Sequence, residues 1–255
     1  MSERKNNLVE MRGVRLQFAG KAILDGVAFS MQPEETLVVM GLSGSGKSTL
    51  LGILMGLLKP DAGSVIFKDE DLTKLSRPKL NDARTHLGMV YQNAALISSM
   101  SVSDNIKLPL QELTGKAGPE IDSIVARKLE LVGLEDAKDK LPSELSGGMQ
   151  KRAGLARALA LEPELVLFDE PSAGLDPINN KLINDLIIHL REKQKVASVV
   201  VTHEMESAFA VATRMAFLHE GKIILEGTPD EFRDSDDPAI SRFLQSYSNG
   251  GKSKE

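Results

Sequence analysis

The 255-residue sequence contains no cysteine and no tryptophan, and only two of its residues are tyrosine. Without cysteine the chain can form neither disulfide bonds nor iron–sulfur clusters, and it offers no thiolate nucleophile. Four histidines are present, but their spacing is not that of metal ligands. The composition therefore excludes a disulfide-stapled fold and cysteine-based chemistry.

Long apolar runs are also missing, and positive charge is not in excess. Charges or glycines interrupt every apolar stretch well short of the roughly 20 residues that cross a bilayer, and the first residues lack the apolar core of a signal peptide. We therefore expect a soluble, cytosolic protein. A net charge of -5, no basic stripe and few aromatic residues argue against nucleic-acid binding.

What is present suffices for a folded core, since 42% of the residues are hydrophobic. Short apolar segments predict parallel strands of an α/β core at residues 37–40, 89–91, 165–168 and 199–202, and helical spacing predicts a helix over 180–193. Alternation over residues 8–31 predicts antiparallel strands beside this core. Residues 214–226 resemble a hairpin with its turn at Glu220-Gly221.

The stretch from residue 93 to about 144 differs from the rest because strand patterns vanish from it. It contains Pro109, Pro119 and an amphipathic run over 121–132 that ends at Gly133, which predicts an inserted helical subdomain. The tail, residues 246–255, is rich in Ser, Gly and Lys, and we expect it to be disordered.

The most informative motif is Gly-Leu-Ser-Gly-Ser-Gly-Lys-Ser at residues 41–48, between the apolar segment 37–40 and a helix-like stretch over 49–58. Strand, glycine loop and helix in this order predict a P-loop, in which Lys47 reaches the β- and γ-phosphates and Ser48 ligates Mg²⁺. A turn that binds nothing explains neither the Lys-Ser pair nor the strand. The other residues expected around the phosphates are Gly41, Ser43, Gly44, Ser45, Gly46 and Thr49.

A second strand ends in two carboxylates, because the apolar residues 165–168 run directly into Asp169 and Glu170. Asp169 is placed to hold Mg²⁺ through water, and Glu170 to orient and deprotonate an attacking water. An acidic pair at a strand end can equally be a solvated turn. The P-loop upstream favours the catalytic interpretation.

Between these motifs, residues 145–149 read Leu-Ser-Gly-Gly-Met and open a predicted helix. Ser146 can cap that helix, and the glycines let backbone N–H groups approach a phosphate closely. Alone this would be a well-capped helix. In the order P-loop, signature and acidic strand end, the chain resembles the ATP-binding-cassette (ABC) ATPases, whose signature begins Leu-Ser-Gly-Gly.

The resemblance assigns roles to four further residues. Gln92 matches the Q-loop glutamine, which touches Mg²⁺ or water and links the core to the helical subdomain. Asp176 matches the D-loop aspartate that faces a partner cassette, and His203 matches the switch histidine that senses the γ-phosphate. Phe18 matches the aromatic residue that stacks on adenine, although it also fits a strand pattern with Val14 and Leu16, so core packing stays open.

The resemblance also implies an architecture and a reaction. The expected fold is a P-loop NTPase cassette of α/β class with a mixed or parallel core sheet, an N-terminal antiparallel β-subdomain and an inserted helical subdomain. Residues 1–92 and 161–245 would form the catalytic core, and 93–160 the helical subdomain with the signature. Two copies would meet head to tail around two ATP molecules. Each site would take its P-loop, Gln92, Asp169, Glu170 and His203 from one chain, and Ser146, Gly148 and Asp176 from the other.

The partners implied are integral-membrane permease subunits that dock near residues 92–110, on the cytoplasmic face of the inner membrane. Three segments resemble the cassettes of MCE-type (Mla-like) phospholipid transport systems: residues 145–178, with Met149 where most cassettes have Gln, residues 226–244 and residues 92–110. This resemblance adds a substrate-binding MCE-type protein to the partners. The alternatives are the ATPase of a small-solute importer and a soluble ABC ATPase of cluster assembly. A chromosome-maintenance ATPase would need a long heptad insertion, which the sequence lacks.

Overall fold

The computed structural model describes residues 7–250, with side chains over 7–245, and contains two β-sheets. The larger sheet has six strands in the order β10-β9-β3-β8-β7-β6. All neighbours in it are parallel except β9 and β10, which form the predicted hairpin. Its strands are β3 (Thr36–Met40), β6 (Leu87–Val90), β7 (Leu165–Asp169), β8 (Ala197–Thr202), β9 (Arg214–His219) and β10 (Lys222–Gly227).

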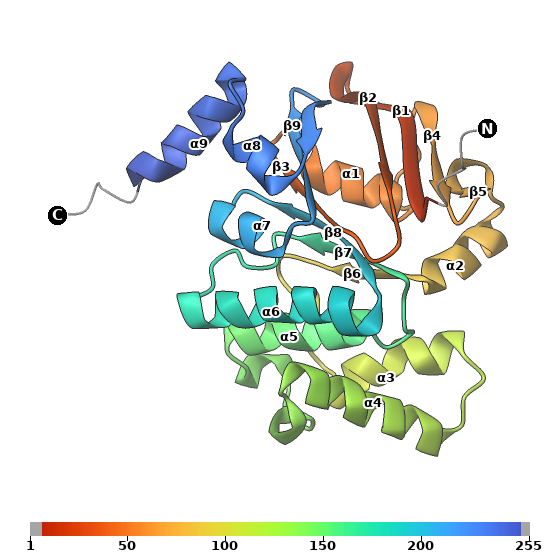
Figure 1. Ribbon diagram of the computed structural model, residues 1–255. Helices are drawn as coiled ribbons and strands as arrows, with labels where there is room; N and C mark the ends of the chain where they lie inside the picture. The colour runs from red at the N-terminus through yellow and green to blue at the C-terminus, as the bar shows by residue number, and fades with distance from the viewer. Residues whose placement is uncertain (1–6, 251–255) are drawn as a thin grey trace.

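The second sheet is antiparallel and has the order β2-β1-β4-β5. The long strands β1 (Val9–Phe18) and β2 (Lys21–Met31) confirm the alternation over residues 8–31. The sequence pattern did not predict β4 (Ala62–Phe67) and the two-residue β5 (Glu70–Asp71). The antiparallel sheet and α1 (Lys47–Leu54) lie in the upper half of Figure 1.

Core residues lie on both faces of the large sheet, which explains why its central strands are apolar at consecutive positions. On one face, Leu37 and Val39 of β3 pack in a cluster with α1 and the antiparallel sheet. On the other face, Val38 and Met40 pack in a second cluster with the helices that follow β6 in the chain. All four side chains are completely buried.

Helices cover this second face and extend away from it (Figure 1). Residues 93–160 fold as helices and turns, as the sequence predicted. The helix α4 ends where Gly133 adopts φ 62°, a left-handed cap that favours glycine. The helices of this region and their neighbours are α3 (Val102–Leu113), α4 (Gly118–Val132), α5 (Gly147–Ala158), α6 (Pro177–Gln194) and α7 (Met205–Val211), and elsewhere α2 (Arg77–Thr85) and α8 (Pro229–Arg233).

Two helix boundaries differ from expectation. The helix after the P-loop ends at Leu54 rather than residue 58, because Gly56 turns the chain with φ 67°. The expectation of a disordered tail is wrong for residues 246–250, since α9 (Pro238–Gly250) continues through them. Ile240 and Phe243 anchor that helix in the core, and adding residues to a formed helix costs little. Residues 251–255 lie outside the described residues.

Strand register brings the ends of four strands to one edge of the large sheet. Met40 pairs with Thr202, Val201 with Asp169, and Phe168 with Val90. The P-loop, His203, Glu170 and Gln92 each follow one of these strand ends, so the fold itself gathers them. Within residues 7–250, no helix is long and apolar enough to cross a membrane.

Candidate active site

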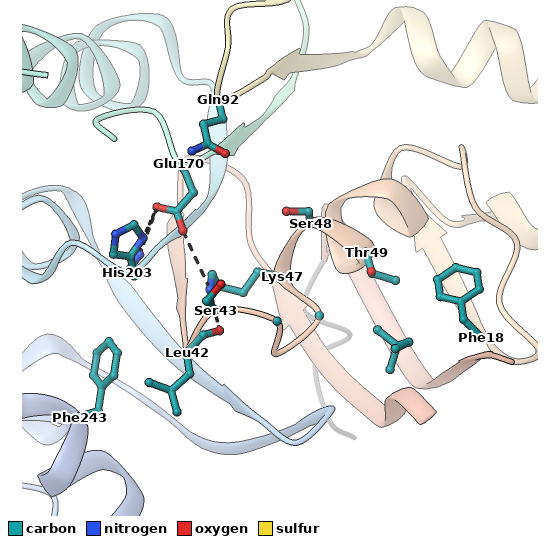
Figure 2. Close-up of a pocket in the computed structure, with 13 residues that line it drawn as sticks. Phe18, Leu42, Ser43, Lys47, Ser48, Thr49, Gln92, Glu170, His203 and Phe243 are labelled. Carbon is teal, nitrogen blue, oxygen red and sulfur yellow. Dashed lines mark hydrogen bonds and ion pairs between the residues drawn. The ribbon is translucent and has the colours of Figure 1, made fainter. Parts of the chain in front are cut away.

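A cleft of about 600 Å³ opens at this edge of the large sheet. Figure 2 shows the P-loop side chains at its centre, Gln92 and Glu170 on one side, and Phe18 and Phe243 toward opposite ends. Ten of the residues that the sequence predicted lie in its wall. The full lining is Phe18, Ile23, Leu42, Ser43, Gly44, Gly46, Lys47, Ser48, Thr49, Gln92, Glu170, His203 and Phe243.

The P-loop adopts a backbone that few residues other than glycine tolerate. Gly44 has φ 78° and Gly46 has φ 103°. A Cβ on Gly46 would lie 2.9 Å from the carbonyl oxygen of Ile23, so a side chain there would force the loop away from β2. Because Gly46 makes no side-chain cap and the first turn of α1 has no acidic residue, the N–H groups of that turn remain for an anion.

Lys47 supplies the positive charge of the loop. Its Nζ donates to the carbonyl oxygens of Gly41 and Leu42, at 2.8 and 3.1 Å, and lies 4.0 Å from a carboxylate oxygen of Glu170. The residue is 8% exposed. Burial lowers the pKa of Lys47, and the carboxylates of Glu170 and Asp169 oppose that effect. A phosphate entering the cleft would pair with a cation that is desolvated and already held in place.

A magnesium ion fits next to the loop. Ser48 Oγ and Asp169 Oδ1 lie 3.1 Å apart, close to the separation of about 3 Å between adjacent ligands of an octahedral Mg²⁺. Burial raises the pKa of Asp169, so its carboxylate is short of solvating partners. Within the described residues no cluster of three or more His, Cys, Asp or Glu could hold a metal ion. Mg²⁺ takes few protein ligands and is held largely by phosphate oxygens and water.

Glu170 is held by the end of the neighbouring strand β8. Its Oε2 accepts hydrogen bonds from Thr202 Oγ1, at 3.1 Å, and from the backbone N–H of His203, at 3.3 Å, and lies 2.9 Å from His203 Nδ1. The backbone of Glu170 is left-handed, with φ 48°, which is strained for a residue with a side chain. This conformation turns the chain at the strand end and leaves Oε1 on the side of Lys47 (Figure 2).

Phe18 lies on the cleft and not in the core. It is 50% exposed, whereas Val14 and Leu16 on the same strand are buried. The β1–β2 pairing shifts register between Leu16 and Gln17, which ends the regular alternation before Phe18. Core packing, the competing interpretation of Phe18, is therefore wrong.

Two of the predicted P-loop residues pack inside the protein and not on the cleft. Gly41 and Ser45 are not part of its lining, but a Cβ on Gly41 would lie 2.3 Å from the carbonyl oxygen of Leu218, which shows how closely the loop meets β9. Ser45 Oγ is buried and has no hydrogen-bond partner among the described residues. A buried unpaired hydroxyl inside a phosphate loop indicates a missing polar ligand.

The signature and the D-loop lie together, but outside the cleft. Ser146 caps α5 by accepting from Met149 N–H at 3.3 Å, and Asp176 caps α6 by accepting from Ile178 N–H and Asn179 N–H at 3.0 Å. Hydrogen bonds from Asn179 hold the pKa of Asp176 below its usual value.

Asn179 also joins the two motifs. A Cβ on Gly148 would lie 2.5 Å from Asn179 Oδ1, so the start of α5 packs directly against the start of α6. Ser146 and Asp176 thus lie exposed side by side, with the buried Gly148 beneath them, and we call these three residues the signature surface. None of the three lines the cleft.

Several residues of the cleft were not predicted from the sequence. Thr202 orients Glu170, while Ile23, Leu42 and Phe243 supply apolar walls. Ile23 and Phe243 belong to β2 and α9, which are distant in sequence from the P-loop, and neither matches a motif. Thr202 immediately precedes His203 at a strand end, and that position was the one available signal.

Comparisons with known proteins agree with this geometry. Residues 24–173 match the family model described as ABC transporter. The chain is 38% identical over 244 residues to the intermembrane phospholipid transport system ATP-binding protein MlaF of Haemophilus influenzae, covering 96% of this chain and 92% of that protein. It is 39% identical over 236 residues to the probable ribonucleotide transport ATP-binding protein mkl of Mycobacterium tuberculosis, covering 92% of this chain and 66% of that protein.

Solved structures give the same result. The dimeric structure of the ATP-binding cassette MJ0796 bound to ADP and Pi, in a post-hydrolysis state, superposes with a TM-score of 0.80 at 31% identity, covering 86% of this chain and 98% of that chain. The predicted ABC cassette fold is confirmed. With its P-loop, acidic strand end and signature in cassette order, the chain belongs to the ABC transporter family as an ATP-hydrolysing, ATP-binding subunit.

Proposed function

We propose that two copies of this chain close head to tail around two ATP molecules and that hydrolysis drives phospholipid transport through a separate membrane permease. One observation supports the proposed dimer. The cleft has the P-loop, Glu170 and His203, whereas the signature surface, with its own capped helix start, lies elsewhere on the same chain. A second copy would place one chain's signature surface over the other chain's cleft.

In this proposal the residues of the cleft divide the work of hydrolysis. Lys47 and the N–H groups of the first turn of α1 bind the β- and γ-phosphates and withdraw charge from them. Ser48, Asp169 and Gln92 would hold Mg²⁺, which would neutralise the charge that develops on the phosphate oxygens.

Glu170 Oε1 accepts a proton from the attacking water while the oxygen of that water bonds to the γ-phosphorus. The bond from that phosphorus to the bridging oxygen of ADP breaks, and ADP and phosphate leave. Thr202 and the backbone of His203 keep Glu170 at the edge of the cleft, and His203 is placed to contact the γ-phosphate. Phe18, half-exposed at one end of the cleft, is placed to stack on adenine.

The segment after the Q-loop is the proposed permease contact. Val102, Ile106 and Leu110 are buried in the helical cluster, but Ile97 remains 36% exposed in the loop before α3. Asn105 is fully buried and holds that loop, because its Oδ1 accepts from Ile97 N–H at 2.8 Å and its Nδ2 donates to three backbone carbonyls. A rigid loop with an apolar tip suits a cytoplasmic helix of a permease.

Phospholipid as cargo is supported by the near-complete, 38% match to MlaF, a protein named for phospholipid transport. An MCE-type protein is the accessory partner that this assignment implies. Ribonucleotide transport, named for the mkl relative, is the second candidate, and there the match covers only 66% of the relative. As the ATPase of a phospholipid transporter, the chain would act on the cytoplasmic face of the inner membrane.

The test is to purify the chain with its membrane partners and measure ATP hydrolysis in lipid nanodiscs. Stimulation by defined phospholipids, together with ATP-driven movement of a fluorescent phospholipid between vesicles, is the expected result. Stimulation by a small polar solute and not by phospholipid would replace the lipid assignment with an importer. Hydrolysis that neither phospholipid nor any membrane partner changes would favour a soluble ABC ATPase.

A further inference from the structure

Helix α5 reaches two loops of the site through basic side chains. Lys151, 8% exposed, donates from Nζ to the carbonyl oxygen of Ala173 at 2.5 Å, in the loop that leads to Asp176. Six residues later, Arg157 donates from Nη1 to the carbonyl oxygen of Ala95 at 2.7 Å and from Nη2 to that of Ala94 at 3.0 Å. The helix that begins with the signature therefore also holds the turn that follows Gln92.

That turn has an unfavourable backbone. Ala94 and Ala95 are consecutive non-glycine residues in the left-handed region, with φ 57° and 50°. Such a conformation costs free energy and persists only where the surroundings impose it. Ala94 is 2% exposed, and a Cβ on Gly154 of α5 would lie 3.0 to 3.2 Å from its atoms. Close packing and the two hydrogen bonds of Arg157 together impose the turn.

Both partners of Arg157 are backbone carbonyls two and three residues after Gln92. The planar guanidinium fork fixes the direction of both carbonyls at once, which an ammonium group cannot do. The helix beneath is firmly seated, since a Cβ on Gly88 of β6 would lie 2.9 Å from the carbonyl oxygen of Ala158. Arg157 thus links Gln92, at one chain's own cleft, to the helix that presents the signature.

We infer that Arg157 is a positioning residue for Gln92, which fixes the Q-loop to the signature helix so that Gln92 and the signature surface move as one unit. The inference rests on the proposed dimer mechanism, because it needs Gln92 to act at the cleft. It predicts that Arg157 affects turnover only through Gln92. It also predicts that the Mg²⁺ requirement, and not only the rate, changes when Arg157 is lost.

The experiment is a double-mutant cycle on ATP hydrolysis by the purified full chain, with Arg157→Ala, Gln92→Ala and the double variant. Arg157→Ala should lower kcat by about tenfold or more and raise the Mg²⁺ concentration for half-maximal activity, because small misplacements of a site residue are costly. In the Gln92→Ala background, Arg157→Ala should have almost no further effect on kcat. Independent, multiplicative losses would overturn the inference.

Arg152 provides a matched control on the same helix. Its Nη1 also donates to two backbone carbonyls, those of Val132 at 2.6 Å and Gly133 at 3.0 Å, but these close α4 and lie away from the Q-loop. Arg152→Ala should lower the melting temperature as Arg157→Ala does, while kcat and the Mg²⁺ requirement stay within about twofold of wild type. Equal kinetic losses in the two variants would mean that Arg157 acts only through stability.

Arg157→Lys covers the case in which the alanine variant does not fold. It keeps the charge and loses the fork, so the same cycle with Gln92→Ala should again be non-additive. If the wild-type protein hydrolyses ATP but all cycles are additive, the inference fails while the proposed function stands. If the wild type and Gln92→Ala hydrolyse ATP equally, the assignment of Gln92 fails, and the inference with it.

Discussion

The cleft and the signature surface are built in different ways within one chain. In the cleft, functional side chains contact one another: Lys47 and His203 both approach Glu170, and Ser48 contacts Asp169. On the signature surface, the polar residues mainly cap their own helices and face no catalytic group of this chain. In the proposed dimer, the cleft supplies most of the reaction centre and the signature surface of the other chain supplies the rest. The difference is what a chain needs if it must meet a second copy before it can react.

The largest expected effect is on kcat and comes from a substitution in the cleft alone. Glu170→Gln removes the base and keeps the shape, so kcat should fall by about 10² to 10⁴ while ATP still binds. Steady-state phosphate release and nucleotide binding measure the two effects. Glu164→Gln, just before the other end of β7, is the matched control and should hydrolyse ATP at close to the wild-type rate. Near-normal turnover by Glu170→Gln would show that another group activates the water.

Lys47→Ala should impair the binding of ATP in the cleft. It removes a cation that would make charge-assisted hydrogen bonds to phosphate, so the Kd for ATP should rise on the order of a hundredfold. Isothermal titration of the purified chain gives that value. Unchanged ATP affinity would remove Lys47 from the phosphate site.

Ser146→Arg sharpens the comparison because it alters only the signature surface. ATP affinity of the isolated chain should stay within about threefold of wild type, while turnover falls tenfold or more, since the bulky cation blocks the partner's site. Mixed with Lys47→Ala chains, it forms heterodimers with one intact site, and part of the activity should return. If Ser146→Arg weakened ATP binding as strongly as Lys47→Ala, the two regions would not be separate.

Most of the cleft could be predicted because its residues sit directly at strand ends. Glu170 and His203 directly follow β7 and β8, the P-loop begins where β3 ends, and parallel strands bring these ends to one edge. The remaining features depend on tertiary contacts, which local sequence patterns do not reveal. The exposure of Phe18 depends on a register shift between two strands, and the helical tail depends on Phe243 packing against Phe217 at 5.0 Å between ring centroids. The Arg157 contacts join residues about 60 positions apart.

The permease contact should respond to a smaller change. Ile97→Glu adds a charge to the exposed loop tip, so the ATPase should leave solubilised membrane complexes while its melting temperature moves by less than about 2 °C. Ile224→Glu is the matched control, because Ile224 is 39% exposed and lies on β10, far along the chain from this loop. Unfolding of Ile97→Glu without selective release would place Ile97 in the core.

The smallest effect concerns the stability of the cleft. Burial raises the pKa of Asp169, so the folded state binds its proton more tightly than the unfolded state does. The charged form therefore destabilises the fold, and this contribution makes stability fall as pH rises from the unfolded pKa through the folded one. Asp169→Asn should raise the melting temperature of the nucleotide-free chain at pH 7 by roughly 2–4 °C while Mg²⁺-dependent hydrolysis is lost. A lower melting temperature would show that the charged form of Asp169 does not destabilise the fold.

The central claim is that one chain's signature surface completes the other chain's cleft. The absence of native cysteine allows a direct measurement with Ser43→Cys, on the exposed cleft wall, and Gly147→Cys, where an added Cβ meets no atom within 4 Å. In the Glu170→Gln background, a mixture of the two single-cysteine chains should form intermolecular disulfides that require ATP. Chains with both cysteines should crosslink between molecules and not within one. Crosslinking that is independent of ATP, or confined to single chains, would contradict the head-to-tail dimer.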